Sequence, residues 1–141
     1  MITNISLISV FVDDIDEAKT FYTEKLGFVP GSDITVQEYR WCTVYQADHP
    51  ELHLQLALPG PPLDEEATEA VKRMMAKGTM HGFGMATDDC RKTFADLVAK
   101  GVEYIQEPSE RPYGVEAVLR DNSGNWLVLV EQKLYAAADF A

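Results

Sequence analysis

The residues able to do acid–base, nucleophilic or metal chemistry are few in this chain, and they are scattered. The histidines are His49, His53 and His81, and the cysteines are Cys42 and Cys90. His53 lies on a regular strand pattern, where its imidazole could orient a ligand or act as a catalytic base near neutral pH. A single histidine on a strand more often only forms a hydrogen bond, so both interpretations stay open. The sequence has no CxxC pair, Gly-rich phosphate loop or Ser/His/Asp motif, and thiol, phosphoryl-transfer and serine-hydrolase chemistry are therefore not indicated.

Aromatic side chains are the other candidates for contact with a small molecule. Trp41 and Trp126 could each offer an indole face to a flat or cationic ligand. Ordinary hydrophobic packing is the alternative, above all for Trp126. Arg111 and Tyr113 lie in a proline-bounded loop, and loops of this kind often carry function. We interpret this loop as a lid over the cleft.

Composition narrows the class of protein. A length of 141 residues with 46% hydrophobic residues is typical of one globular domain. The formal charge of −11 argues against nucleic acid and anionic membrane surfaces as partners, because both select basic faces. The charge suits attraction of a cationic small molecule. Alternatively, it only makes the surface soluble. No apolar window approaches the roughly 18 residues of a membrane span, no signal-peptide pattern opens the chain, and two free thiols suit a reducing compartment, so we expect a cytoplasmic protein.

The elements that would position these residues occur twice in the same order. A predicted strand over 5–12 ends at Asp13-Asp14, and a helical stripe then runs to Gly27. A predicted strand over 83–87 ends at Asp88-Asp89, and a second helical stripe runs to Gly101. Predicted strands follow each helix, at 39–45 and 51–58 in the first copy and at 102–105, 115–119 and 126–130 in the second. The pattern predicts a duplicated βαβββ unit, with a turn at 30–33 and a connector helix between the copies.

The stretch DNSGNWLVLVE, residues 121–131, closes the second copy. Its first five residues form a turn cluster. The strand that follows is apolar on both faces, with Trp126, Val128 and Val130 on one face and Leu127 and Leu129 on the other. A strand of this kind is covered on both sides. One cover would be helices, and the other would be more core, a partner subunit or a ligand.

Three stretches together resemble the vicinal oxygen chelate superfamily, which includes glyoxalase I, extradiol dioxygenases, and fosfomycin- and bleomycin-resistance proteins. They are SVFVDDIDEAKTFYTEKLGF, GFGMATDDCRKTFADLVAKGVEYIQEP and RDNSGNWLVLVEQ. The resemblance implies an α+β fold in which two tandem βαβββ modules form curved mixed sheets around a cleft, with helices outside, often as a homodimer. It divides a single domain over 1–141 into module one at about 4–58, a connector helix at about 63–78, module two at about 80–132 and a C-terminal tail at 133–141.

The metal positions of the family fall on residues that are mostly unable to coordinate. Carried over by position, the four ligands correspond to Leu7, Gln55, Gly82 and Val128. A lone amide does not hold a divalent transition metal, which needs several donors, so we expect no cofactor. The alternative is a shifted strand register in which His53, His81 and Glu131 bind Ni, Zn, Mn or Fe.

The resemblance also implies which side chains face the cleft. They form an apolar cup with a few polar groups, as is usual for small-molecule sites, although a second core or a dimer interface would use the same pattern. We predict a metal-free protein of the bleomycin-resistance type, associated with antibiotic resistance, that binds a hydrophobic or cationic ligand. The alternative is a metal-dependent lyase, isomerase or dioxygenase, which leaves open whether the protein is an enzyme. The predicted ligand-binding residues are Leu7, Ser9, Phe11, Trp41, His53, Gln55, Tyr113, Trp126 and Val128.

Overall fold

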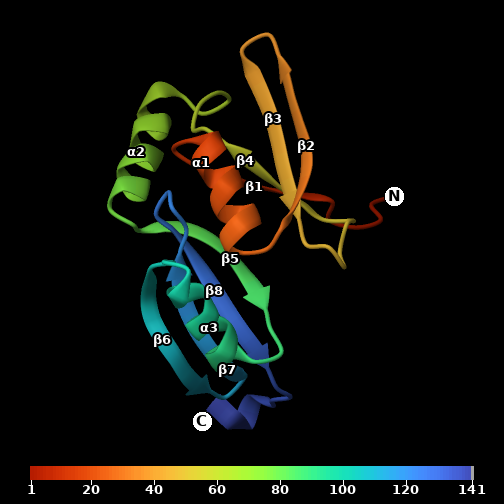
Figure 1. The fold of residues 1–141 in the computed structure, drawn as a ribbon, viewed down its shortest axis with the longest axis vertical. Helices are drawn as coiled ribbons and strands as arrows, with labels where there is room; N and C mark the ends of the chain where they lie inside the picture. The colour runs from red at the N-terminus through yellow and green to blue at the C-terminus, as the bar shows by residue number, and fades with distance from the viewer. Residues whose placement is uncertain (141) are drawn as a thin grey trace.

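The structure, a computed structural model that describes residues 1–140, contains two separate four-stranded sheets (Figure 1). Ala141, the last residue of the predicted C-terminal tail, lies outside the described residues. The first module consists of β1 (Leu7–Phe11), α1 (Ile15–Thr20), β2 (Val29–Val36), β3 (Tyr39–Tyr45) and β4 (His53–Ala57). After the connecting helix α2 (Glu65–Ala76), the second module consists of β5 (Met80–Ala86), α3 (Cys90–Ala99), β6 (Tyr104–Arg111), β7 (Gly114–Arg120) and β8 (Asn125–Gln132).

The two sheets have the same topology, as the predicted duplication requires. Their strand orders are β1-β4-β3-β2 and β5-β8-β7-β6. In each sheet the first strand of the module pairs in parallel with the last one, and the remaining pairs are antiparallel. The expected α+β fold with two βαβββ modules is therefore confirmed.

Both module helices begin at the second aspartate of an Asp-Asp pair. The side chains of Asp14 and Asp89 accept hydrogen bonds from the backbone N–H groups of Glu17 and Lys92, which satisfies one exposed donor at each helix start. Helix α1 continues into a π-helical turn, Phe21–Lys25. The chain then reverses at Gly27 with φ +80°, a left-handed conformation that glycine adopts without steric cost.

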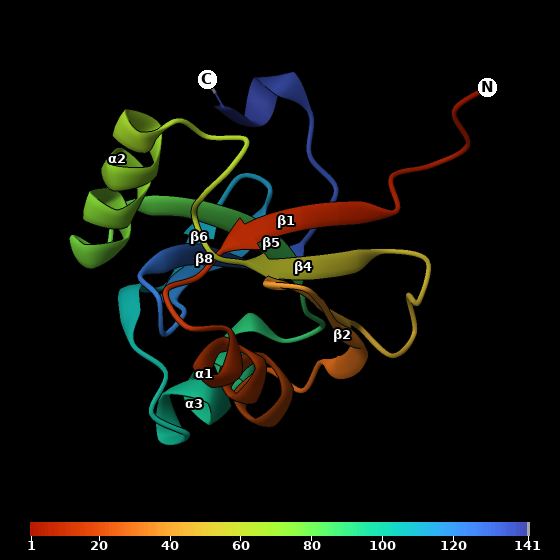
Figure 2. The ribbon, with the colours of Figure 1, turned by 90° about the horizontal axis from the view of Figure 1, so that it is seen from above.

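Figure 2 shows the helices α1 and α3 on the same side of the two sheets. One hydrophobic core runs between the helices and the sheets, and it joins residues of both modules. Its fully buried members include Val12, Tyr22, Leu56, Leu119 and Leu127. The opposite face of each sheet points away from this core, and it is the face that the sequence assigns to the cleft.

A polar junction links the two modules at the turn between β7 and β8. The buried carboxylate of Asp121 accepts hydrogen bonds from the Tyr22 hydroxyl at 2.6 Å and from the backbone and side-chain nitrogens of Asn125. Asn125 also donates to the carbonyl of Phe11 at 2.7 Å, and the Ser123 hydroxyl donates to Asp13 at 2.9 Å. Burial and the neighbouring carboxylate raise the pKa of Tyr22 well above its usual value, so this hydroxyl stays protonated and keeps donating.

Two strands differ from the sequence prediction. The predicted turn at 30–33 is instead a bulge inside the long strand β2, with the pairing to β3 shifted between Pro30 and Asp33. Strand β6 continues through Pro108, although this proline was expected to lie between strands. β6 is the edge strand of its sheet and its register shifts twice, so the missing N–H of proline is tolerated there.

A charged cluster holds the β2–β3 hairpin against α1. The carboxylate of Asp33 receives two hydrogen bonds at 2.9 Å from Arg40 and one at 2.8 Å from Lys19. Arg40 also contacts Asp16 on α1 at 2.7 Å. Hydrogen bonds from Arg40 and then from Lys19 hold the pKa of Asp33 well below its usual range.

Among the described residues, no helix is both long and apolar enough to cross a membrane.

Candidate ligand-binding faces

The cup face of the first sheet is defined by strand register. Leu7 lies opposite His53 and Ser9 opposite Gln55 in the parallel β1–β4 pair. Thr43 lies opposite Gln55, and Tyr45 opposite His53, in the antiparallel β3–β4 pair. Residues directly opposite one another share a face, so strands β1, β4 and β3 place these side chains together. Side chains two or four residues away on the same strands complete the face: Phe11, Ala57, Trp41 and Tyr39.

A hydrogen-bonded chain crosses this face. The Ser9 hydroxyl donates to Gln55 Oε1 at 2.9 Å, and Gln55 Nε2 donates to the Tyr39 hydroxyl at 2.5 Å. Gln55 is buried, whereas 57% of the Tyr39 side chain is exposed. The amide of Gln55 is therefore engaged on both sides, and Tyr39 is the exposed end of the chain.

His53 is held from two sides. Its Nδ1 lies 2.9 Å from Thr43 Oγ1, and its ring stacks on Tyr45 with the centroids 4.8 Å apart. The backbone of Gly31 in the β2 bulge lies directly above this pair, since a Cβ there would come within 2.3 Å of Thr43 Oγ1 and 3.0 Å of His53 Nδ1. Glycine at this position lets the bulge close over the imidazole.

The cup face of the second sheet is more apolar. Gly84 and Ala86 on β5 lie opposite Val128 and Val130 on β8. Trp126 extends the same face, and its indole N–H donates to the carbonyl of Gly78 at 2.6 Å. The side chain is 37% exposed, so part of the indole remains available for contact.

A bulge in β5 changes the position of His81. The register shifts between His81 and Phe83, so that His81 lies opposite Trp126 and Gly82 is the extra residue. Counting from the sequence placed Gly82, and not His81, at the family's metal position on the cup face. The structure corrects this, because the bulge turns the exposed His81 onto the cup side. Gly82 is required for the close approach, as a Cβ there would lie 2.1 Å from the Trp126 carbonyl oxygen.

These residues do not fit the metal set of the family. The four corresponding positions now carry Leu7, Gln55, His81 and Val128, and both polar atoms of the Gln55 amide are already hydrogen-bonded. Glu131, proposed as a ligand in the shifted register, lies on the helix side, where it accepts a hydrogen bond at 3.0 Å from the backbone N–H of Cys90 at the start of α3. Within residues 1–140 no three His, Cys, Asp or Glu side chains come together. One imidazole and one engaged amide supply too few donors.

Tyr113 sits at the end of the second sheet, in the turn between β6 and β7. Its hydroxyl donates to Glu116 on the cup side of β7. Its ring stacks on Phe140 of the C-terminal 3-10 helix (Ala137–Phe140), with the centroids 6.3 Å apart. The predicted lid loop is thus a tight hairpin turn in contact with the C-terminal segment.

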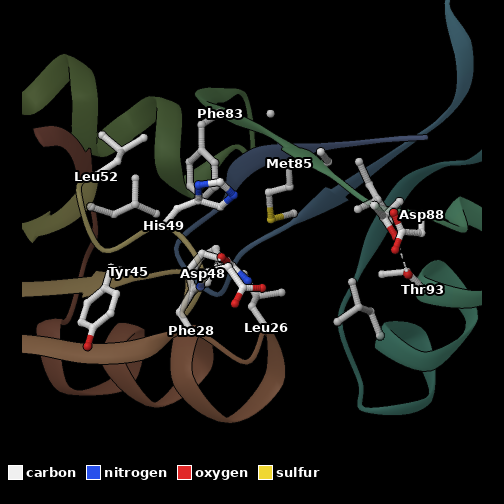
Figure 3. Close-up of a pocket in the computed structure, with 17 residues that line it drawn as sticks. Leu26, Phe28, Tyr45, Asp48, His49, Leu52, Phe83, Met85, Asp88 and Thr93 are labelled. Carbon is white, nitrogen blue, oxygen red and sulfur yellow. Dashed lines mark hydrogen bonds between the residues drawn. The ribbon is translucent and has the colours of Figure 1, made fainter. Parts of the chain in front are cut away.

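A cavity of about 700 Å³ lies at the seam of the modules, between the β3–β4 loop and β5 with α3 (Figure 3). Tyr45, Gly84 and Ala86 of the cup faces also contribute to its lining. Its floor is apolar and includes Phe28, Phe83 and Met85. Asp48 and His49 lie on the loop side of the opening, and Asp88 lies on the α3 side. None of the predicted ligand-binding residues lines this cavity.

Sequence reasoning missed Tyr39, Thr43 and Tyr45 as cup residues. The signal was present, because all three have the same parity as Trp41 on β3 and alternate residues of a strand share a face.

The two cysteines are inert structural residues, as Cys42 and Cys90 are both buried and burial raises the pKa of each thiol.

Comparison with known proteins now decides the family. A sequence model of the Glyoxalase/Bleomycin resistance protein/Dioxygenase superfamily matches residues 4–129. The chain belongs to this superfamily. The expected membership is therefore confirmed.

Individual relatives agree with this assignment. The uncharacterised protein YurT of Bacillus subtilis (strain 168) is 35% identical over 131 residues, which cover 91% of this chain and 98% of YurT. The crystal structure of UcmS2 is 42% identical with a TM-score of 0.86, over 94% of this chain and all of that one. TnmS3, an antibiotic binding protein from Streptomyces sp. CB03234, is 28% identical with a TM-score of 0.75, over 94% of this chain and 98% of TnmS3.

Proposed function

We propose that this protein binds a small hydrophobic or cationic molecule between its cup faces without a metal cofactor. The observation that carries the proposal is the replacement of the family's metal donors by Leu7 and Val128, with the remaining amide of Gln55 engaged within the protein. Aromatic and aliphatic groups line the same faces, which is the usual composition of a small-molecule site. The similarity to an antibiotic-binding protein supports an antibiotic or a comparable compound as the ligand.

A homodimer would complete the site. In the single chain, Leu7 and Trp126 are each 37% exposed, and the neighbouring strands β1 and β5 are the edges of their sheets. Exposed apolar side chains on or beside an unpaired sheet edge favour a covering partner. A second copy that brings its second-sheet face against the first-sheet face would enclose two equivalent cups, since the contact is reciprocal in a twofold dimer.

The test combines metal analysis with ligand titration of the full chain, purified without a chelating tag. We expect less than about one tenth of an equivalent of Ni, Zn, Mn or Fe after dialysis, because the site offers too few donors. Titration with neutral 9-fluorenone or with cationic acridine orange should quench tryptophan fluorescence. Near-stoichiometric metal that survives dialysis would overturn the metal-free site, and absence of binding by both compounds would overturn the ligand-binding function. Light scattering should show a dimer, and a monomer at all concentrations would refute the shared cup.

A further inference from the structure

The hydrogen bonds on the first-sheet cup face determine which groups remain free to meet a ligand. Gln55 Oε1 accepts from the Ser9 hydroxyl, and Gln55 Nε2 donates to the Tyr39 oxygen. Because the Tyr39 oxygen already receives a proton, its own O–H is free and is directed to an acceptor elsewhere. Tyr39 is 57% exposed, so that acceptor lies on the open side of the face. Tyr39 is therefore a donor toward the cup.

A second donor follows from the partners of Thr43. This side chain is only 1% exposed, and in the described structure its hydroxyl oxygen has two partners, the backbone N–H of Ser32 at 3.0 Å and His53 Nδ1 at 2.9 Å. The Ser32 N–H can only donate. The buried Thr43 proton therefore has one acceptor, His53 Nδ1, because a buried hydroxyl is normally satisfied. A neutral imidazole that accepts at Nδ1 carries its proton at Nε2.

The same assignment bears on catalysis. With Nδ1 occupied and Nε2 protonated, His53 has no free lone pair to remove a proton from a ligand. The stacked Tyr45 ring and the Gly31 backbone keep the imidazole in this orientation. The face thus offers His53 as a hydrogen-bond donor and leaves it unsuited to the role of catalytic base.

We infer that the first-sheet cup face selects neutral, flat ligands that carry carbonyl oxygens, which accept from the Tyr39 O–H and the His53 Nε2–H. This inference rests on the proposed function and narrows its ligand class. Two uncharged donors oppose a cation at this position, and the protein charge of −11 opposes an anion such as a carboxylate. A neutral carbonyl satisfies both conditions, and an aromatic skeleton suits the neighbouring Tyr45 and Trp41 rings.

The first arm of the experiment needs no ligand. Nitrogen-15 NMR of the imidazoles in the intact protein should show His53 protonated at Nε2 and unprotonated at Nδ1. Thr43→Val keeps the shape of the side chain and removes its hydroxyl. In this variant the preference of His53 for the tautomer protonated at Nε2 should disappear. A His53 protonated at Nδ1 in the wild-type protein would overturn the donor assignment.

The second arm compares 9-fluorenone with fluorene, two flat tricycles that differ in one carbonyl group. We expect the intact protein to prefer fluorenone by roughly 3- to 10-fold, the range for one neutral hydrogen bond. Tyr39→Phe or His53→Phe should reduce the preference while fluorene binding persists. Tyr104→Phe is the matched control, because Tyr104 packs on Phe94 on the helix side and should leave the ratio unchanged.

The outcomes separate the two proposals. Equal binding of the two tricycles, or a preference that survives in both Tyr39→Phe and His53→Phe, overturns the carbonyl class and leaves the binding function intact. If Ser9→Ala loses the preference for fluorenone while Tyr39→Phe and His53→Phe keep it, the Gln55 amide is reversed. That result also overturns the donor assignment. If neither tricycle binds, the carbonyl class fails, and the proposed function fails with it when acridine orange does not bind either. The NMR arm still decides the tautomer of His53.

Discussion

The hydrogen bond between Tyr22 and Asp121 provides a direct test of how the two modules are held together. Tyr22→Phe removes one oxygen atom from a fully buried ring and changes little else in the packing. The lost bond is 2.6 Å long and joins two buried groups, and a bond of this kind to a charged group contributes about 1.5–3 kcal/mol. Asp121 keeps three other donors, from the backbone of Ser123 and from Asn125. We therefore expect a loss near the middle of the range, about 2 kcal/mol.

Urea unfolding at one fixed protein concentration, followed by tryptophan fluorescence, measures this loss. The concentration is fixed because association would shift the apparent stability. In a domain of this size the same loss lowers the melting temperature by roughly 6 °C. Tyr104→Phe is the control, since no hydrogen bond involves its half-exposed hydroxyl in the described structure, and it should change stability by less than about 0.5 kcal/mol. Equal, small effects in the two variants would refute the view that this bond holds the modules.

Three further predictions address the hairpin, the bulge and the thiols. Asp33→Asn should lower the free energy of unfolding by about 1 kcal/mol at pH 7, a modest value because the ion pair is partly exposed. Folding lowers the pKa of Asp33, so its stabilisation is present above the unfolded pKa and is lost as the pH falls from the unfolded toward the folded pKa. Urea unfolding curves of wild type and variant should therefore converge in acid. Gly31→Ala should cost about 1–3 kcal/mol in urea unfolding and abolish fluorenone binding, because the added Cβ meets the Thr43 hydroxyl and His53; unchanged binding would refute the role of the bulge. Both buried thiols should react with Ellman's reagent far more slowly in the native protein than in urea, and fast native reaction would contradict their burial.

The regular part of the fold was predictable because it follows local patterns. The duplication, the strand ends at Asp13-Asp14 and Asp88-Asp89 and the two-faced strand around Leu127 all follow from residue type and spacing. The bulges were not predictable from local patterns, because they depend on contacts across the sheet. Pro30-Gly31-Ser32 has the composition of a turn, and only its closure over His53 makes it a bulge.

The candidate site was predictable in part for the same reason. Alternation placed His53 and Gln55 on one face of their strand, and the family resemblance implied that Ser9 shares this face. The roles of these residues depend on partners from β3, and sequence spacing does not reveal a hydrogen bond between Gln55 and Tyr39. The position of His81 depended on a single extra residue, because one residue of slip exchanges the two faces of a strand.

The seam between the modules has two ends that the duplication made equivalent and that now differ. At one end, Tyr22 of the first copy meets the Asp121 turn of the second. At the other end, Leu97 takes the place of Tyr22, the β3–β4 loop takes the place of the turn, and the two border the cavity of about 700 Å³. One end of the seam is therefore held by buried hydrogen bonds, whereas the cavity leaves space at the other end. A movement between the modules that preserved those bonds would have to pivot about the Asp121 turn, and it would open or close the cavity.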